Sequence, residues 1–286
     1  MQNSYNEALS ITISSNTLFH FTSGILNIIS ILRDGFFKPN LCLEDLSSLK
    51  IEDNVAIPMV SFCDIPLSQT KTHMEVYGRC GIGLSKSWGK NNGVSPVIYT
   101  YPGSPLTASL SQCLRWTHKK YLDFEESQSE PSPFPASVAR AIRTNPRPDE
   151  KQYIELWDQL LKIQCFIKPY EGPFQKGAKS FPNIRFYDER EWRFVPELEI
   201  DLFKYLLEKI EYNDFTTRKK ANREIQARSR IRFELSDIKY IIIAQEKDIL
   251  TMIRKIEEIG GDRSTQNQLK VLSSNIISAQ RIVEDF

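Results

Sequence analysis

The sequence of 286 residues lacks any apolar run that approaches the ~20 residues needed to cross a membrane. Its first residues, MQNSYNE, contain neither the basic stretch nor the apolar region of a signal peptide. Charge of either sign is not in excess, because 37 Lys and Arg face 36 Asp and Glu, so no global field draws the chain to nucleic acid or to a membrane. These absences predict a soluble cytoplasmic protein that does not bind membranes.

The sequence is also poor in residues that bind metals. It has 3 His and 5 Cys, and no two of the cysteines form a C-x-x-C pair, so we expect no metal site. The odd number and wide spacing of the cysteines predict reduced, mostly buried thiols, as is usual in the cytoplasm. With 41% hydrophobic and 26% charged residues, the composition is that of a globular protein with a sizeable core.

Strand and helix patterns are mixed along the chain without a steady βαβ alternation, which favours the α+β class. Strands are expected at residues 18–22, 57–64, 80–85, 96–101, 164–168, 231–235 and 240–244, with an extended segment at 185–195. Helices are expected at residues 25–32, 68–76, 150–161 and 248–258, and residues 268–283 are expected to return to the sheet. We predict a single domain over residues 1–286, with a flexible insertion around residues 124–148 that is rich in Pro, Ser and Glu.

Two short motifs carry chemical information, and the first is His20-Phe21-Thr22 at the end of a predicted strand. Side chains two residues apart on a strand point to the same face, so His20 and Thr22 can together bind a ribose diol. The helix that follows begins nearby, and its N-terminus favours a phosphate. The alternative is a half-buried strand histidine that is bonded to backbone.

The second motif is Glu189-Arg190-Glu191-Trp192-Arg193, at the entrance to or within a strand. Glu189 and Glu191 are then expected on one face, where mutual repulsion assigns two carboxylates different protonation states or roles. One can stabilise an oxocarbenium ion while the other orients a nucleophile. The alternative is a solvated edge strand in which Glu and Arg alternate.

A third stretch, residues 216–232, is strongly basic and holds a single acid, Glu224. It is a candidate surface for a phosphate backbone, with Arg218, Lys219, Lys220 and Arg223 as the nucleic-acid-binding residues. The alternative is an ordinary solvated helix face and loop.

The ordered string LFHFTSGILNIISILRDGFF, IPMVSFCDIPLS, YGRCGIGLSKSW, SPVIY, KPYEG and FYDEREWRFVP resembles the AbiGi family of abortive phage infection proteins over about residues 15–245. This resemblance implies a role in antiviral defence. The family name is associated with an antitoxin of a toxin–antitoxin pair, which implies a cognate partner protein.

A strand with H-x-T, a helix that closes in I-L-x-x-G and a late E-x-E are similar to ADP-ribosyltransferases, most of all to the DarT group. This likeness implies a split, mostly antiparallel sheet with helical insertions, and NAD as cofactor. It assigns His20, Thr22 and Ser61 to NAD binding, Glu191 to catalysis and Glu189 to activation of the acceptor. The sequence departs from the pattern in having no S-T-S, no H-G-[ST], and Phe21 after the histidine.

The function expected from these likenesses is transfer of ADP-ribose from NAD to a macromolecular acceptor, either nucleic acid or protein, in a phage-infected cell. Two alternatives stay open. One is a non-enzymatic antitoxin or sensor that keeps the cleft of an ADP-ribosyltransferase only as scaffold, and the other is an NAD glycohydrolase, in which water is the acceptor of ADP-ribose.

Overall fold

The computed structural model describes residues 15–49, 54–127, 148–176, 179–197, 206–261 and 265–285. The chain divides into two compact units, each made of segments that are distant in the sequence. The first comprises Met1–Gly35, Phe62–Asn91 and Phe233–Phe286, and the second comprises Phe36–Ser61 and Asn92–Arg232. Strand β4 (Asn54–Cys63) passes from the second unit to the first after Ser61.

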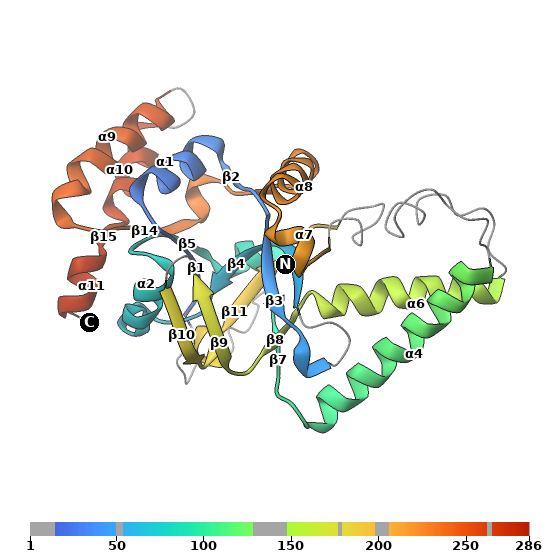
Figure 1. Ribbon diagram of the computed structural model, residues 1–286. Helices are drawn as coiled ribbons and strands as arrows, with labels where there is room; N and C mark the ends of the chain where they lie inside the picture. Colours follow the sequence, from blue (N-terminus) through green and yellow to red (C-terminus); the bar gives the residue numbers. More distant parts are fainter. Residues whose placement is uncertain are drawn as a thin grey trace, which may run out of the picture. The chain divides into compact units, whose positions relative to one another are not determined.

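The first unit combines strands of one sheet with short helices (Figure 1). Besides the end of β4, its elements are β1 (Thr17–Thr22), α1 (Ile25–Asp34), η2 (Leu67–Gln69), α2 (Lys71–Tyr77), β5 (Cys80–Ser85), α3 (Lys86–Asn91), η5 (Leu235–Asp237), β14 (Ile238–Ile243), η6 (Glu246–Asp248), α9 (Ile249–Gly260), α10 (Gln266–Ser274), β15 (Ile276–Ser278) and α11 (Ala279–Asp285). The strand order is β15-β14-β5-β1-β4, and only the β14–β15 pair is parallel within this unit.

The alternation of β1 places Phe19 and Phe21 in the core of this unit, together with Met74, Ile242 and Ile282. The facing strand β5 leaves room for the two rings by carrying glycine opposite them. A Cβ at Gly83 would lie 2.8 Å from the Phe19 ring, and one at Gly81 would lie 3.1 Å from the Phe21 ring. The C-G-I-G sequence of β5 is therefore explained by the aromatic residues of β1.

The second unit contains more and shorter strands. Besides the first part of β4, its elements are β2 (Phe36–Phe37), β3 (Asn40–Asp45), η1 (Ser47–Leu49), β6 (Ser95–Pro96), β7 (Ile98–Thr100), α4 (Pro105–Ser127), α6 (Pro148–Gln164), β8 (Ile167–Pro169), β9 (Gly172–Lys176), β10 (Lys179–Ile184), η3 (Phe186–Glu189), β11 (Glu191–Phe194), β12 (Leu207–Glu208), α7 (Lys209–Asn213), α8 (Phe215–Arg228) and β13 (Ile231–Arg232).

Strand β4 is the centre of this unit. Its first half pairs antiparallel with both β3 and β12, and β11 lies between β4 and β6. Two further pairs join β2 to β13 and β9 to β10, and β7 pairs with β8 in parallel. The long helices α4 and α6 run side by side (Figure 1) and share a core with residues of η1 and β4. Strand β11 thus carries Glu191 next to β4, and Lys168 of β8 contacts Glu191.

The predicted α+β class with a mostly antiparallel sheet is confirmed in both units. The helix expected at residues 25–32 is confirmed as α1, which ends at Gly35, where φ is 70° and the N–H bonds to Ile31 O. The expected strand at residues 164–168 was wrong in its start, since α6 continues to Gln164 and β8 begins at Ile167. Within residues 231–235 the strand is limited to Ile231–Arg232 (β13), and Leu235 begins η5. Strand β15 returns to the sheet within residues 268–283, as expected.

The predicted insertion around residues 124–148 falls mostly outside the described residues, which omit 128–147. At its ends, helix α4 continues to Ser127 and helix α6 begins at Pro148. Within the described ranges, no helix combines the length and the apolar character that a membrane span requires.

Candidate functional site

Glu191 and Arg193 lie in the interior of the second unit. Both are in β11, whose alternation places them on one face, and their residues are 5% and 0% exposed. Because β11 has neighbours on both sides, β4 and β6, the alternative of a solvated edge strand is wrong. Because Glu191 and Arg193 are two residues apart on β11, both charged side chains point into the interior of the unit.

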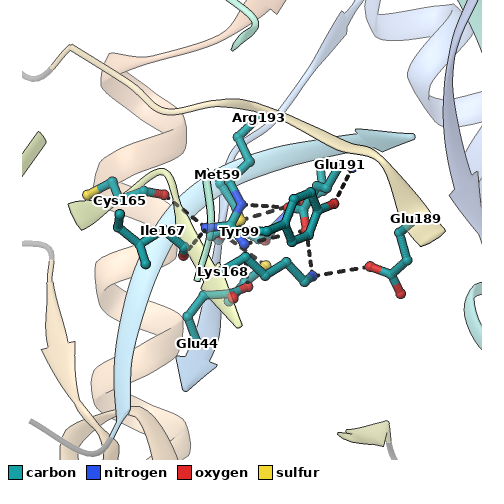
Figure 2. Close-up of polar contacts among 12 residues, drawn as sticks. Glu44, Met59, Tyr99, Cys165, Ile167, Lys168, Glu189, Glu191 and Arg193 are labelled. Atoms are coloured by element: carbon teal, nitrogen blue, oxygen red, sulfur yellow. Dashed lines mark hydrogen bonds and ion pairs between the residues drawn. The ribbon is translucent and has the colours of Figure 1, made fainter. Parts of the chain in front are cut away.

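The carboxylate of Glu191 is fully engaged by protein donors (Figure 2). Ser61 Oγ of β4 donates to Oε1 at 3.0 Å, and Lys168 Nζ of β8 donates to Oε2 at 2.5 Å. The Arg193 guanidinium donates to Oε1 through Nε at 2.6 Å and to Oε2 through Nη2 at 3.4 Å. A carboxylate has about four lone-pair positions, so these four contacts leave none open.

Two further carboxylates complete what we call the buried ion cluster, which consists of Glu44, Lys168, Glu189, Glu191 and Arg193. Lys168 Nζ also contacts Glu189 Oε2 at 3.2 Å, and Arg193 Nη2 contacts Glu44 Oε1 at 2.9 Å. Arg193 donates in addition to the carbonyl oxygens of Cys165 and Ile167, at 2.9 and 3.4 Å. Figure 2 shows Lys168 between the carboxylates of Glu189 and Glu191.

Glu189 was expected to share a strand face with Glu191, and this expectation was wrong. It lies at the end of η3, and Arg190 follows with φ 45° in the left-handed region before β11 begins. The turn at Arg190, rather than strand periodicity, lets both carboxylates meet Lys168. Lys168 itself lies over the ring of Phe186, 4.7 Å from its centre.

The electrostatics of the buried ion cluster keep its charges in place. Burial alone would raise the pKa of Glu191, but the charges and hydrogen bonds of Arg193 and Lys168 outweigh it and hold this pKa far below its ordinary value. Burial, with the charges of Glu44 and Glu191, raises the pKa of Cys42 to about 12. Burial also raises the pKa of Tyr99, whose hydroxyl accepts the N–H of Glu191 at 2.8 Å.

Of the predicted site residues, Ser61, Glu189 and Glu191 lie in the second unit and come together around Lys168 and Arg193. His20 and Thr22, which the likeness to ADP-ribosyltransferases assigns to NAD binding, lie in the first unit, and this assignment stays a prediction. They are half-buried on one face of β1, as expected. The imidazole of His20 lies 5.8 Å from the ring of Phe62, and Thr22 Oγ1 accepts from Asn27 Nδ2 at 2.7 Å.

Sequence reasoning missed Lys168, Arg193, Glu44 and Tyr99. A signal existed for the first two: Lys168 sits in the apolar strand segment I-K-P, and Arg193 is two residues from Glu191. A cation in either place needs a buried carboxylate partner. For Glu44 and Tyr99 no local pattern pointed inward, since β3 and β7 supply them from distant parts of the sequence.

The predicted nucleic-acid-binding residues lie on α8 and differ in their exposure to solvent. Lys219, Lys220 and Arg223 are exposed. Arg218 is half-buried: its guanidinium donates to Tyr212 O at 2.8 Å and lies 4.8 Å from the centre of the Tyr212 ring. Arg218 thus packs against the preceding helix, α7, and the other three face solvent.

Under the likeness to ADP-ribosyltransferases, Glu191 would need a free carboxylate oxygen to hold the ribose of NAD. Its side chain is only 6% exposed and its lone pairs are taken by Ser61, Lys168 and Arg193. In this arrangement Glu191 does not fit a ribose hydroxyl. Among the residues that the structure describes, no three His, Cys, Asp or Glu are grouped as a metal would require.

Comparison with known proteins gives a match to one family model. Residues 36–244 match the family described as "Putative abortive phage resistance protein AbiGi, antitoxin". This match includes Ser61, Glu189 and Glu191, and begins after His20 and Thr22.

The chain is also similar to the "Abortive phage resistance protein AbiGi" of Lactococcus lactis subsp. cremoris. The two are 28% identical over 277 residues, which cover 87% of this chain and 99% of the relative. No solved structure matches. Since the family model covers well over half of the sequence, the chain belongs to the AbiGi family of abortive phage resistance proteins.

Proposed function

We propose that this chain acts in phage defence as a non-enzymatic, antitoxin-type protein that binds a cognate partner of the same defence system. The family description supports both the defence role and the antitoxin role. One structural observation carries the non-enzymatic part. All acceptor positions of Glu191, the carboxylate that catalysis would need, are occupied by Ser61, Lys168 and Arg193.

A buried ion cluster of this kind, in which every carboxylate contacts a cation, serves the fold. Separating one cation from such a cluster leaves an uncompensated buried charge, which costs free energy. This free-energy cost favours the single arrangement in which all contacts are made. In the second unit it joins residues of β3, β8, η3 and β11, while Ser61 adds β4. The buried ion cluster then acts as scaffold for surfaces elsewhere on the unit.

A second candidate function is ADP-ribose transfer from NAD, and the contact of Ser61 with Glu191 favours it. These residues are far apart in the sequence, yet they hydrogen-bond at 3.0 Å from neighbouring strands, as the likeness to ADP-ribosyltransferases implies. This function requires Lys168 or Arg193 to release Glu191 when NAD binds. An NAD glycohydrolase differs only in accepting water in place of a macromolecule.

Ser61→Ala distinguishes the two functions, with Ser111→Ala as the matched control. Each removes one serine hydroxyl, and Ser111 Oγ donates to Leu49 O at 2.5 Å within the same unit. Each variant should lose about 1 kcal/mol of stability, the net contribution of one hydrogen bond. Phage protection is scored by plaque counts on cells that produce each variant, and NAD consumption is followed with the purified wild type.

The non-enzymatic proposal expects wild-type protection from both variants and no consumption of NAD. A tenfold or greater loss of protection in Ser61→Ala alone, together with NAD turnover by the wild type, would establish the second candidate instead.

A further inference from the structure

The strongest unassigned surface of the second unit is a basic face that begins on α8. Lys219, Arg223 and Gln226 follow one another at helical spacing, so their side chains form one stripe along the helix. Lys220 is exposed on the adjoining row. Two acidic groups lie nearby: Asp214, whose Oδ2 accepts the N–H of Thr217 at the start of α8, and Glu224, which is half-buried and is the single acid within residues 216–232. The stripe therefore presents positive charge to solvent.

This stripe continues beyond the helix to a second group of cations. Gln226 Nε2 donates to Pro39 O and to Asn40 Oδ1, which fixes the end of α8 beside the β2–β3 connection. Arg230 Nε donates to Gln226 O, which places Arg230 at the end of the stripe. The helix of 14 residues spans roughly 20 Å, so the face is long enough for several nucleotides.

At that end three cations surround one aromatic ring. Lys38 Nζ lies 5.4 Å from the centre of the Phe36 ring, and the guanidinium carbons of Arg230 and Arg232 lie at 4.7 and 5.5 Å. The antiparallel pairing of Arg232 with Phe36 in β13 and β2 sets this arrangement. Phe36 itself is half-buried.

The other end of α8 repeats the combination of ring and cation. Phe215, the first residue of the helix, is 63% exposed, and Lys219 Nζ lies 5.4 Å from its ring centre. Arg218 lies 5.9 Å from the same ring, against the α7 side. Exposing a phenyl ring costs free energy that burial against a planar partner recovers. Rings flanked by cations at both ends of a basic stripe suit a chain that alternates flat bases with phosphates.

We propose that this basic face, made of Phe36, Lys38, Phe215, Lys219, Lys220, Arg223, Arg230 and Arg232, binds single-stranded nucleic acid. The cations contact phosphates, and Phe215 stacks on an unpaired base. A paired strand keeps its bases inside the duplex and offers no ring face to Phe215, so the exposed ring favours a single strand. This function is independent of the partner-binding role proposed above.

The experiment measures binding of fluorescein-labelled, mixed-sequence oligonucleotides of about 12 nucleotides to the full chain, as single-stranded RNA, single-stranded DNA and duplex. The charge variant is Lys219→Glu with Lys220→Glu and Arg223→Glu. The matched control is Arg115→Glu with Lys119→Glu and Lys120→Glu, three exposed cations on α4 of the same unit. Circular dichroism confirms that each variant is folded.

We expect the α8 charge variant to lose at least 100-fold in affinity for single strands, while the α4 variant stays within threefold of wild type. The slope of log K against log salt should fall by about 2 in the α8 variant, since each phosphate contact on a single strand contributes about 0.7. Phe215→Ala should weaken single-strand binding about tenfold and leave duplex binding unchanged.

Three outcomes overturn the proposal. The first is equal binding by wild type and the α8 charge variant. The second is tighter binding to duplex than to single strands, with no effect of Phe215→Ala. The third is binding of polyglutamate in place of either nucleic acid, which would assign the face to an acidic protein.

Discussion

At the scale of single residues, Arg190 decides how the buried ion cluster forms. Its φ of 45° lies in the left-handed region, which costs an L-residue roughly 1–2 kcal/mol. The turn it makes separates η3 from β11 and directs Glu189 and Glu191 to the same ammonium group. A local backbone cost is thus balanced by the pairing of two buried carboxylates.

Substitutions at Arg190 should therefore follow backbone preference. Arg190→Gly is expected to remain within about 1 kcal/mol of wild type, because glycine adopts this conformation without strain. Arg190→Val should unfold at lower urea concentration than Arg190→Ala, because a β-branched side chain tolerates positive φ least. Urea unfolding of the three variants tests this order. A valine variant as stable as the glycine variant would contradict the structure at this turn.

Glu191 should reveal its pairing through the pH dependence of stability. Its pKa in the folded protein is lowered from an ordinary value of 4.5, so its contribution is complete above that pH and is lost as the pH falls below it. Glu191→Gln should cost about 3 kcal/mol at pH 7, because Lys168 and Arg193 stay buried with one carboxylate fewer.

The measurement is urea unfolding of wild type and Glu191→Gln at a series of pH values between 7 and 3. The difference in the free energy of unfolding between the two proteins should shrink below pH 4.5. In that range Glu191 of the wild type takes up a proton when the protein unfolds, which favours the unfolded state and lowers wild-type stability. A difference that stays constant over this range would show that Glu191 is not held as a paired anion.

At the scale of elements, the end of α2 is fixed against β1 by a glycine. Gly78 has φ 116°, and a Cβ there would lie 2.3 Å from Thr22 O and 2.7 Å from the Cα of Ser23. Backbone atoms cannot rotate away as a side chain can. This close approach places α2 beside the strand that carries His20 and Thr22.

Gly78→Ala should therefore be among the most destabilising glycine substitutions, at about 3 kcal/mol or more. Gly93→Ala is the control, because Gly93 has φ 73° with nothing within 4 Å of the added Cβ, so only backbone strain of roughly 1 kcal/mol is expected. Thermal unfolding of the two variants measures the difference. Equal melting temperatures would mean that the contact with Thr22 does not constrain α2.

Elements with a clear local pattern were predictable from the sequence, and elements defined by distant contacts were not. Helix α1 and strands β1, β5 and β14 carry regular apolar spacing, and each appears close to its expected place. Helix α4 was missed because its buried positions include Ser111 and Thr117, which leave its apolar spacing weak. The side chains that bond to the Glu191 carboxylate come from β4, β8 and β11. Ser61 was assigned through the family likeness, and Arg193 and Lys168 carried a local signal, but their meeting at one carboxylate depends on pairings between distant strands.

At the scale of the whole molecule, the state of the five cysteines follows from burial. All are free, Cys113 is exposed, and Cys63, Cys80 and Cys165 are buried, so the expectation that most of the thiols are buried is confirmed. Burial raises the pKa of Cys165 to about 12, and burial with nearby carboxylates does the same for Cys42. A thiol with so high a pKa has almost no thiolate at neutral pH.

Titration of the native protein with a thiol reagent at pH 8 should show one fast-reacting group, and titration in denaturant should show all five. Cys113→Ser should remove the fast phase and leave the slow ones unchanged. Two or more fast thiols in the folded protein would indicate that a cysteine described as buried is open to solvent.

The buried ion cluster also limits how this part of the protein can change over evolutionary time. Loss of Lys168 or Arg193 alone leaves buried carboxylates without their cation, at a cost of several kcal/mol. The free energy of unfolding of natural proteins is only about 5–15 kcal/mol, so a variant that has lost one of these cations retains little stability. Stepwise substitution through such a variant is therefore strongly disfavoured. Replacement of opposite charges by apolar side chains of similar volume avoids the stranded charge, but it needs simultaneous changes in β8 and β11. Descendants of this chain are therefore expected to keep these charges as a set or to exchange them together.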